Sequence, residues 1–268
     1  HHCILPAGRS VGVDGPGPYH RTVTDLHLAA AVTRWYQANA RDLPWRRPGV
    51  SPWAVLVSEV MLQQTQVSRV EPVWLAWCDR WPVPTALAAE PAGAAIRAWG
   101  RLGYPRRALR LHGCATAIVE RHHGQVPTGL DDLLALPGVG AYTARAVAAF
   151  AFRQRHPVVD TNVRRVFARA DAGWPEASPA TTVADLTAVA AQLPTDPEAA
   201  ATASVAFMEL GALICTARAP RCGECPLLAA CAWHRHRATA LPGSAVEPPA
   251  TAVGPVAPAG GTVGPVAR

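Results

Sequence analysis

The sequence predicts an all-α protein. Between about residue 24 and residue 235, apolar side chains recur at the spacing of a helix, and no alternating strand pattern of useful length occurs. Ala, Leu, Val and Arg fill segments of about 10 to 15 residues, which are separated by Pro or Gly. Half of the 268 residues are hydrophobic, which is enough for a substantial core in one large domain or two modest ones.

The two ends of the chain differ from this helical part. Residues 1–23 are rich in Gly and Pro and have no apolar period, and residues 236–268 repeat the phrase Val-Gly-Pro-Val-Ala. Such composition is typical of disorder. We therefore expect a disordered N-terminal segment over 1–23 and a disordered low-complexity tail over 236–268.

The charge balance fits nucleic acid as a partner but does not require it. The 25 basic residues are all arginines and outnumber the 19 acidic residues, which gives a sequence pI near 9.2. No stretch is long and apolar enough to span a membrane. Seven cysteines without a secretory signal indicate a reducing cytoplasm, where we expect Cys3, Cys78 and Cys114 to be unpaired thiols.

The other four cysteines predict a metal site near the end of the helical part. Their spacing is C-x6-C-x2-C-x5-C, and they are Cys215, Cys222, Cys225 and Cys231. Thiolates favour an iron–sulphur cluster or zinc. Structural zinc sites usually combine two close-spaced ligand pairs, and this loop has only one C-x2-C, so an iron–sulphur cluster is the better prediction. Arg218 and Arg221 lie within the loop, and we expect both to contact phosphate.

A helix-hairpin-helix is predicted in the middle of the chain. Leu-Pro-Gly-Val-Gly at 136–140 separates a short helical run at 131–135 from a longer one over about 141–152. Gly138 and Gly140 permit a tight turn that leaves amide hydrogens free at the start of the second helix. These amides and the helix dipole would bind a DNA phosphate, although an ordinary helix connection is the simpler alternative.

Two acidic residues have opposite surroundings. Glu59 has Val55, Leu56 and Leu62 as helical neighbours, which desolvates the carboxylate and raises its pKa. Asp160 precedes a helical run, where an N-cap aspartate is favoured as the anion. A carboxylic acid paired with a carboxylate is the arrangement that cleaves a glycosidic bond. The simpler alternatives are a plain cap for Asp160 and a partly exposed helix residue for Glu59.

Beyond these features, the chain from about residue 25 to 233 resembles the endonuclease III superfamily of DNA glycosylases, and most closely its MutY-type adenine glycosylases. The resemblance rests on the order and spacing of six segments: LPWR at 43–46, SEVMLQQTQV at 58–67, LGY at 102–104, LPGVG at 136–140, VDTNV at 159–163, and the cysteine loop.

This resemblance implies two helical domains that flank a DNA-binding cleft, into which an adenine is flipped. Residues 47–149 would form a six-helix barrel that carries the helix-hairpin-helix. Residues 24–46 and 150–235 would together form a domain around a [4Fe–4S] cluster. The implied partner is double-stranded DNA with an adenine mispaired with 8-oxoguanine or guanine, and the protein is expected to act as a monomer.

The resemblance also implies roles for individual residues. Glu59 would protonate the adenine ring, Asp160 would stabilise the sugar cation, and Tyr142 and Asn162 would assist them. The DNA contacts would come from Gln64 and Thr65 at the opposite purine, Tyr104 as a wedge, and Leu102, Gly138, Gly140, Arg218 and Arg221. The pocket for the flipped base would contain Arg41, Trp45 and Arg46.

The composition narrows the reaction type. Bifunctional relatives use a lysine at the position of Tyr142 to attack the sugar, and this chain has no lysine. A monofunctional hydrolytic glycosylase is therefore the preferred interpretation. A mismatch thymine or uracil glycosylase of the same superfamily remains an alternative, as does a non-catalytic DNA-binding protein on the same scaffold.

Two departures from the adenine glycosylase pattern affect specificity. Ser204 and Val205 stand where these enzymes usually carry an Asn-Gln or Asn-Glu pair that helps to hold the base. The 33 residues after Arg235 are too few and too rich in Pro and Gly for the MutT-like domain that recognises 8-oxoguanine. The preference for 8-oxoguanine over guanine is therefore left open.

Overall fold

The computed structural model describes residues 28–239, and every regular element in this part is helical, as the sequence predicts. The α-helices are α1 (Leu28–Asn39), α2 (Pro52–Met61), α3 (Val67–Arg80), α4 (Pro84–Ala88), α5 (Ala92–Trp99), α6 (Arg106–His122), α7 (Leu130–Leu134), α8 (Ala141–Phe150), α9 (Thr161–Phe167), α10 (Val183–Gln192), α11 (Pro197–Leu213) and α12 (Ala232–Thr239). Short helical turns occur at η1 (Pro44–Arg46), η2 (Ala168–Ala172) and η3 (Cys222–Glu224).

The predicted disordered ends lie almost entirely outside the described residues. Residues 1–23 belong to the part that is not described, as do residues 240–268. The last helix, α12, continues to Thr239, so the prediction of disorder from residue 236 is wrong for four residues. No helix within 28–239 combines the length and apolar character that crossing a membrane requires.

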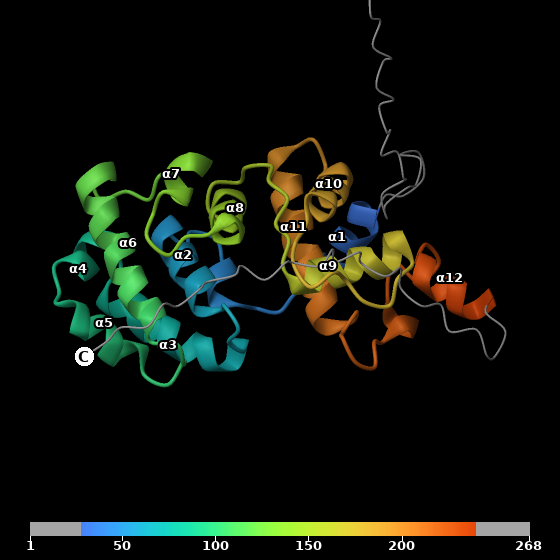
Figure 1. Cartoon of the computed structure of the whole chain (residues 1–268), viewed down its shortest axis with the longest axis horizontal. Coiled ribbons are helices and arrows are strands. Elements are labelled where there is room, and N and C mark those ends of the chain that lie inside the picture. Colours follow the sequence, from blue (N-terminus) through green and yellow to red (C-terminus); the bar gives the residue numbers. More distant parts are fainter. Residues whose placement is uncertain (1–27, 240–268) are drawn as a thin grey trace, which may run out of the picture.

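Figure 1 shows the helices in two groups, with α2 to α8 in one and α1 with α9 to α12 in the other. The first group surrounds a core rich in tryptophan. Trp77 packs edge-on against Trp81 and Trp99, with ring centroids 4.7 and 5.8 Å away. Leu43 and Trp45, which precede the predicted boundary at residue 47, also belong to this core.

The second group brings together segments from both sides of the first. Helix α1 packs against α11, and Phe167 of α9 meets Phe207 of α11 with ring centroids 5.0 Å apart. A small cluster of Ala146, Ala149 and Val158, with Met208 against it, joins α8 to α11. The two separate cores agree with the predicted division into two domains. The residue limits of these domains stay a prediction.

The predicted hairpin is present between α7 and α8. The two helices begin or end within two residues of the predicted limits. Gly138 has φ +79°, and a Cβ atom there would lie 2.7 Å from Cβ of Arg110, so both the backbone and the neighbouring helix α6 require glycine. Gly140 is the N-cap of α8 in extended conformation, which leaves the first amides of that helix facing outward.

Candidate active site and DNA-binding cleft

A cavity of about 990 Å³ lies where the two groups of helices meet, because its walls come from both. One side consists of residues from α2, α6 and α8, and the other of residues from α9 and α11 with the segment at 41–46. It brings together ten of the predicted site residues: Arg41, Trp45, Arg46, Glu59, Gln64, Thr65, Tyr104, Tyr142, Asp160 and Asn162.

Glu59 is buried on the cavity wall, with 6% of its surface exposed. It lies in α2, which starts at the N-cap Ser51 and at Pro52 and is almost entirely buried. Burial raises the pKa of Glu59 to about 7, although a hydrogen bond from Tyr142 and the charge of Arg46 oppose this shift. The predicted desolvation is confirmed, and near neutral pH about half of these carboxyl groups carry a proton.

Tyr142 comes from the first turn of α8, directly after the hairpin. Burial raises its pKa well above the usual 10, and the nearby carboxylates of Glu59 and Asp160 raise it further. The hydroxyl therefore stays protonated and can donate a hydrogen bond to Glu59. The hairpin thus places a permanent donor beside the carboxyl group.

Asp160 is the N-cap of α9, as predicted, and its Oδ1 accepts a hydrogen bond from the Val163 amide at 2.7 Å. Its Oδ2 accepts from Asn162 Nδ2 at 2.8 Å. These bonds lower the pKa of Asp160, but burial is the larger effect and raises it above its usual value. The expected preference of the N-cap for the anion is therefore opposed by desolvation inside the cavity, which the sequence interpretation left out.

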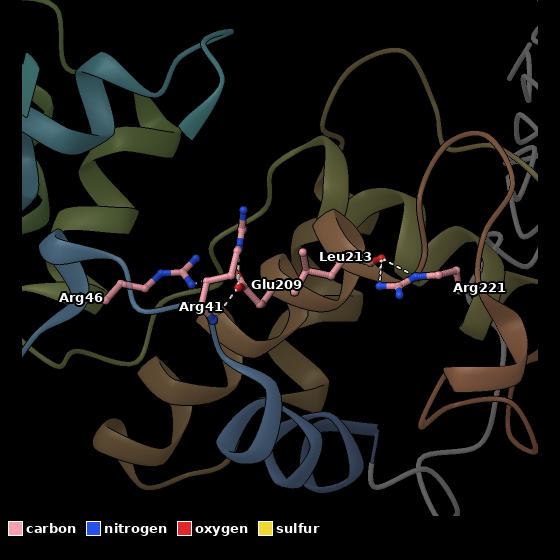
Figure 2. A network of polar contacts seen from close by, with 5 residues as sticks. All are labelled: Arg41, Arg46, Glu209, Leu213 and Arg221. Atoms are coloured by element: carbon pink, nitrogen blue, oxygen red, sulfur yellow. Dashed lines mark hydrogen bonds and ion pairs between the residues drawn. The ribbon is translucent and has the colours of Figure 1, made fainter. Parts of the chain in front are cut away.

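A buried carboxylate that the sequence interpretation missed organises the opposite wall. Glu209 of α11 has no exposed side-chain surface and accepts from Arg41 Nε at 2.6 Å, Arg41 Nη2 at 2.8 Å and Arg46 Nη1 at 2.8 Å. Figure 2 shows Arg41 and Arg46 converging on Glu209. These hydrogen bonds and charges lower the pKa of Glu209 to about 2, so it is ionised at neutral pH.

Two loops with predicted DNA contacts border the same cavity. Gln64 and Tyr104 are exposed, with 65% of the Tyr104 surface accessible, and Thr65 is half-buried. Leu102 is different, because only 4% of its surface is exposed and it packs in the first core. This burial does not favour a DNA contact through the Leu102 side chain, because the side chain packs in the core beneath the loop.

The four cysteines line one small cavity beside Arg169 and Trp233. Burial and the neighbouring Cys215, Cys231 and Cys222 together raise the pKa of Cys225 to about 11. Arg169 Nη1 lies 3.5 Å from Cys215 Sγ, so one guanidinium faces this group of sulphurs. Within residues 28–239, no three histidine, cysteine, aspartate or glutamate side chains are arranged to hold a single metal ion. A multi-atom iron–sulphur cluster, which spans more space than one zinc ion and supplies positive charge, fits this arrangement.

The two arginines of the cysteine loop differ in the structure. Arg218 is exposed and its guanidinium contacts none of the described residues through a hydrogen bond. Arg221 donates to the Leu213 carbonyl oxygen at 2.7 and 3.2 Å and to Glu224 at 3.1 Å, as Figure 2 shows for Leu213. Arg221 therefore closes the end of α11, and Arg218 is the better candidate for a phosphate contact.

Other arginines connect the parts of the site, and the sequence interpretation missed them as well. Arg165 donates to Asn162 and to the carbonyl oxygen of Cys215, and Arg169 donates to the carbonyl oxygens of Thr216 and Ala217. No local motif marks these partners. For Glu209, the available signal is a single acidic residue inside the otherwise apolar run from Val205 to Leu213 in α11.

Comparison with known proteins defines the class. Residues 57–192 match the HhH-GPD superfamily of base excision DNA repair proteins, and residues 215–231 match the iron–sulphur binding domain of endonuclease III. The solved structure of a thermostable thymine-DNA glycosylase shares the fold, with a TM-score of 0.71 at 23% identity over 78% of this chain and 95% of that one. The [4Fe–4S] prediction and the DNA partner are thereby confirmed.

Curated relatives narrow the class further. The adenine DNA glycosylase of Mycobacterium tuberculosis is 57% identical over 220 residues, which cover 82% of this chain and 69% of that protein. The adenine DNA glycosylase of Mycolicibacterium smegmatis is 58% identical over 212 residues, covering 79% and 70%. The chain belongs to the adenine DNA glycosylase family.

Proposed function

We propose that the protein hydrolyses the N-glycosidic bond of adenine mispaired with guanine or 8-oxoguanine in duplex DNA. The observation that carries this proposal is the placement of Glu59, with a pKa of about 7, in the same cavity as Asp160. An adenine leaves only as a protonated base, and the sugar becomes cationic as it departs. One group must give a proton and the other must balance a positive charge.

Glu59 is suited to give the proton. Its pKa lies close to neutral pH, which provides both a large protonated fraction and a sufficiently strong acid. The Tyr142 hydroxyl holds the carboxyl group in place through its hydrogen bond. After transfer to the adenine ring nitrogen, the resulting carboxylate can accept a proton from the attacking water.

Asp160 is suited to stabilise the sugar cation. The Val163 amide and Asn162 fix both of its oxygens, so the carboxylate has one orientation before the substrate arrives. Preorganised charge of this kind costs no rearrangement during the reaction. Since no lysine occurs in the 268 residues, no side-chain amine can form a Schiff base with the sugar, and the reaction ends at hydrolysis.

The remaining cavity residues would select the substrate. Arg41, Trp45 and Arg46 form the wall that would receive the flipped adenine, with Glu209 holding the two arginines. Gln64 and Thr65 would contact the opposite purine while Tyr104 enters the base stack. The protein is proposed to act as a monomer, as the resemblance to the family implies.

The test is single-turnover release of adenine from duplexes that contain adenine opposite 8-oxoguanine or guanine, with thymine opposite guanine as the comparison. We expect release of adenine and none of thymine. Glu59→Gln should slow release by about 100-fold or more while duplex binding changes little. Glu120→Gln, at an exposed position of α6 outside the cavity, is the matched control. If Glu59→Gln kept more than a tenth of the rate, another group would be the acid.

A further inference from the structure

Two separate loops border the cavity, and both have an unusual backbone. The first loop follows α2 and carries Gln64 and Thr65, and the second precedes α6 and carries Tyr104. Gln64 has φ +53° and Tyr104 has φ +49°. Residues with side chains rarely adopt this left-handed conformation, so other contacts must hold each loop in its shape.

Arg107 makes those contacts to both loops. Its Nη1 donates to the carbonyl oxygens of Val60 and Met61 at 3.2 Å each and to the Gln63 carbonyl oxygen, all at the end of α2 and the start of the first loop. Its Nη2 donates to Thr65 Oγ1 at 3.1 Å in that loop. Thr65 and Leu102 are 37 positions apart in sequence, yet the same guanidinium also reaches the second loop.

In the second loop, Nη2 of Arg107 donates to the carbonyl oxygens of Gly103 at 3.2 Å and Leu102 at 3.4 Å. The guanidinium also lies 5.4 Å from the centroid of the Tyr104 ring. A cation at this position is attracted to the face of the ring. Thr65 and Gly103 thus share one nitrogen of one side chain.

Arg107 is buried, with 7% of its surface exposed, and its Nε has no hydrogen-bond partner among the described residues. Burying a charge with one unpaired donor costs free energy. In Arg107, the hydrogen bonds from the remaining donors to the two loops offset this cost. Only the planar fork of arginine can serve several acceptors in two directions. A lysine ammonium is a compact charge without this planar geometry, so it could not donate hydrogen bonds to both loops at once.

We propose that Arg107 is a positioning residue that couples the contact with the opposite base to insertion of the Tyr104 wedge. This inference rests on the proposed function of the two loops. A displacement of Gln64 and Thr65 changes the position of the guanidinium and hence the carbonyl oxygens of the wedge loop. Tyr104 then inserts fully into the base stack only where Gln64 and Thr65 contact the opposite purine.

A double-mutant cycle measures this coupling directly. Gln64→Ala, Tyr104→Ala and the double variant are compared in the wild-type protein and in an Arg107→Met background. The duplex carries 2′-fluoro-deoxyadenosine opposite guanine, because the fluorine disfavours the sugar cation and prevents cleavage. Dissociation constants and the fluorescence of a neighbouring 2-aminopurine report binding and unstacking, so the result does not depend on catalysis.

We expect the two loop substitutions to be non-additive by about fivefold or more in the wild-type protein, and additive within about twofold when Arg107 is Met. Arg107→Lys, which keeps the charge, should also abolish the non-additivity. This variant replaces Arg107→Met as the background of the cycle if Arg107→Met unfolds. Arg155→Met is the matched control, since Arg155 also donates to three carbonyl oxygens, those of Ala190, Leu193 and Pro194.

Additive effects in the wild-type protein would overturn the proposal, as would non-additivity that persists in both Arg107 variants. Failure of the proposed function would look different. In that case the wild-type protein would release no adenine from an ordinary mispair, whatever the outcome of the cycle. A protein that releases adenine but shows additive loops would disprove the role of Arg107 alone.

Discussion

Arg165 donates a hydrogen bond from Nε to the carbonyl oxygen of Cys215 at 2.6 Å, which ties α9 to a cysteine of the iron–sulphur loop. The same guanidinium donates from Nη2 to Asn162 Oδ1 at 2.8 Å, and Asn162 in turn donates to Asp160. A continuous path of hydrogen bonds therefore leads from the cysteine loop to the carboxylate proposed to stabilise the sugar cation. Arg165 therefore supports both the cysteine loop and, through Asn162, the Asp160 carboxylate.

The first prediction follows from this path. Arg165→Met should lower the single-turnover rate of adenine release by about 10- to 100-fold, because Asn162 and then Asp160 lose their orientation. The measurement is the rate together with the iron content. Arg155→Met should leave both unchanged, since its partners lie at the end of α10. A wild-type rate in Arg165→Met would show that Asn162 orients Asp160 unaided.

The second prediction concerns the pH dependence of the rate. The protonated form of Glu59 is the proposed acid, and burial raises its pKa to about 7. The single-turnover rate should therefore fall tenfold per pH unit above about pH 7 and level off below it. Rates measured from pH 5.5 to 9 at constant ionic strength test this. A rate that rises across the same range would contradict an acid role for Glu59.

The third prediction concerns stability. The folded pKa of Glu59, about 7, lies above the usual 4.5, so the native state binds the proton more tightly and loses stability as pH rises from about 4.5 to 7. Glu59→Gln removes the buried charge and should raise the free energy of unfolding by about 1 to 3 kcal/mol at pH 8. Urea unfolding at pH 5 and pH 8 should show a smaller gain at pH 5. An equal gain at both would point to packing instead.

The fourth prediction addresses Glu209. Glu209→Ala leaves Arg41 and Arg46 without their shared partner and should cost about 3 kcal/mol or more at pH 7. Because the folded pKa of Glu209 is lowered to about 2, its contribution is present above its usual 4.5 and is lost as pH falls toward 2. The difference in urea unfolding should therefore shrink below pH 4. Glu198→Ala breaks an exposed pair with Arg153 and should cost less than about 1 kcal/mol.

The fifth prediction separates the two arginines of the cysteine loop. Arg218→Ala should reduce the slope of log affinity against log salt by about 0.9, the value for one lost phosphate contact, with iron retained. Arg221→Ala should mainly loosen the loop, because it removes the bonds to the Leu213 carbonyl oxygen, and iron should be lost more readily. If Arg218→Ala has the wild-type slope, the exposed guanidinium does not contact DNA.

Much of the site was predictable because its signals are local. The desolvation of Glu59 depends on neighbours within one helix, the cap of Asp160 on the three residues that follow it, and the tight hairpin on glycines. The spacing of the cysteines likewise predicts the cluster, since four ligands within 17 residues need little help from the rest of the chain. In each case the chemistry is fixed by residues that are near one another in sequence.

What only the tertiary structure decided involves residues that are far apart. Glu209 meets Arg41 across 168 positions, and Arg107 meets the loop after α2 across 42 to 47. Leu102 lies between the exposed Arg101 and Gly103, yet the turn directs its side chain into the core. The sequence by itself determined the helices, the hairpin, the cysteine loop and the residue types of the chemistry. Packing decided which charges are paired and which side chains are buried, because burial and pairing depend on what the second group of helices places against the first.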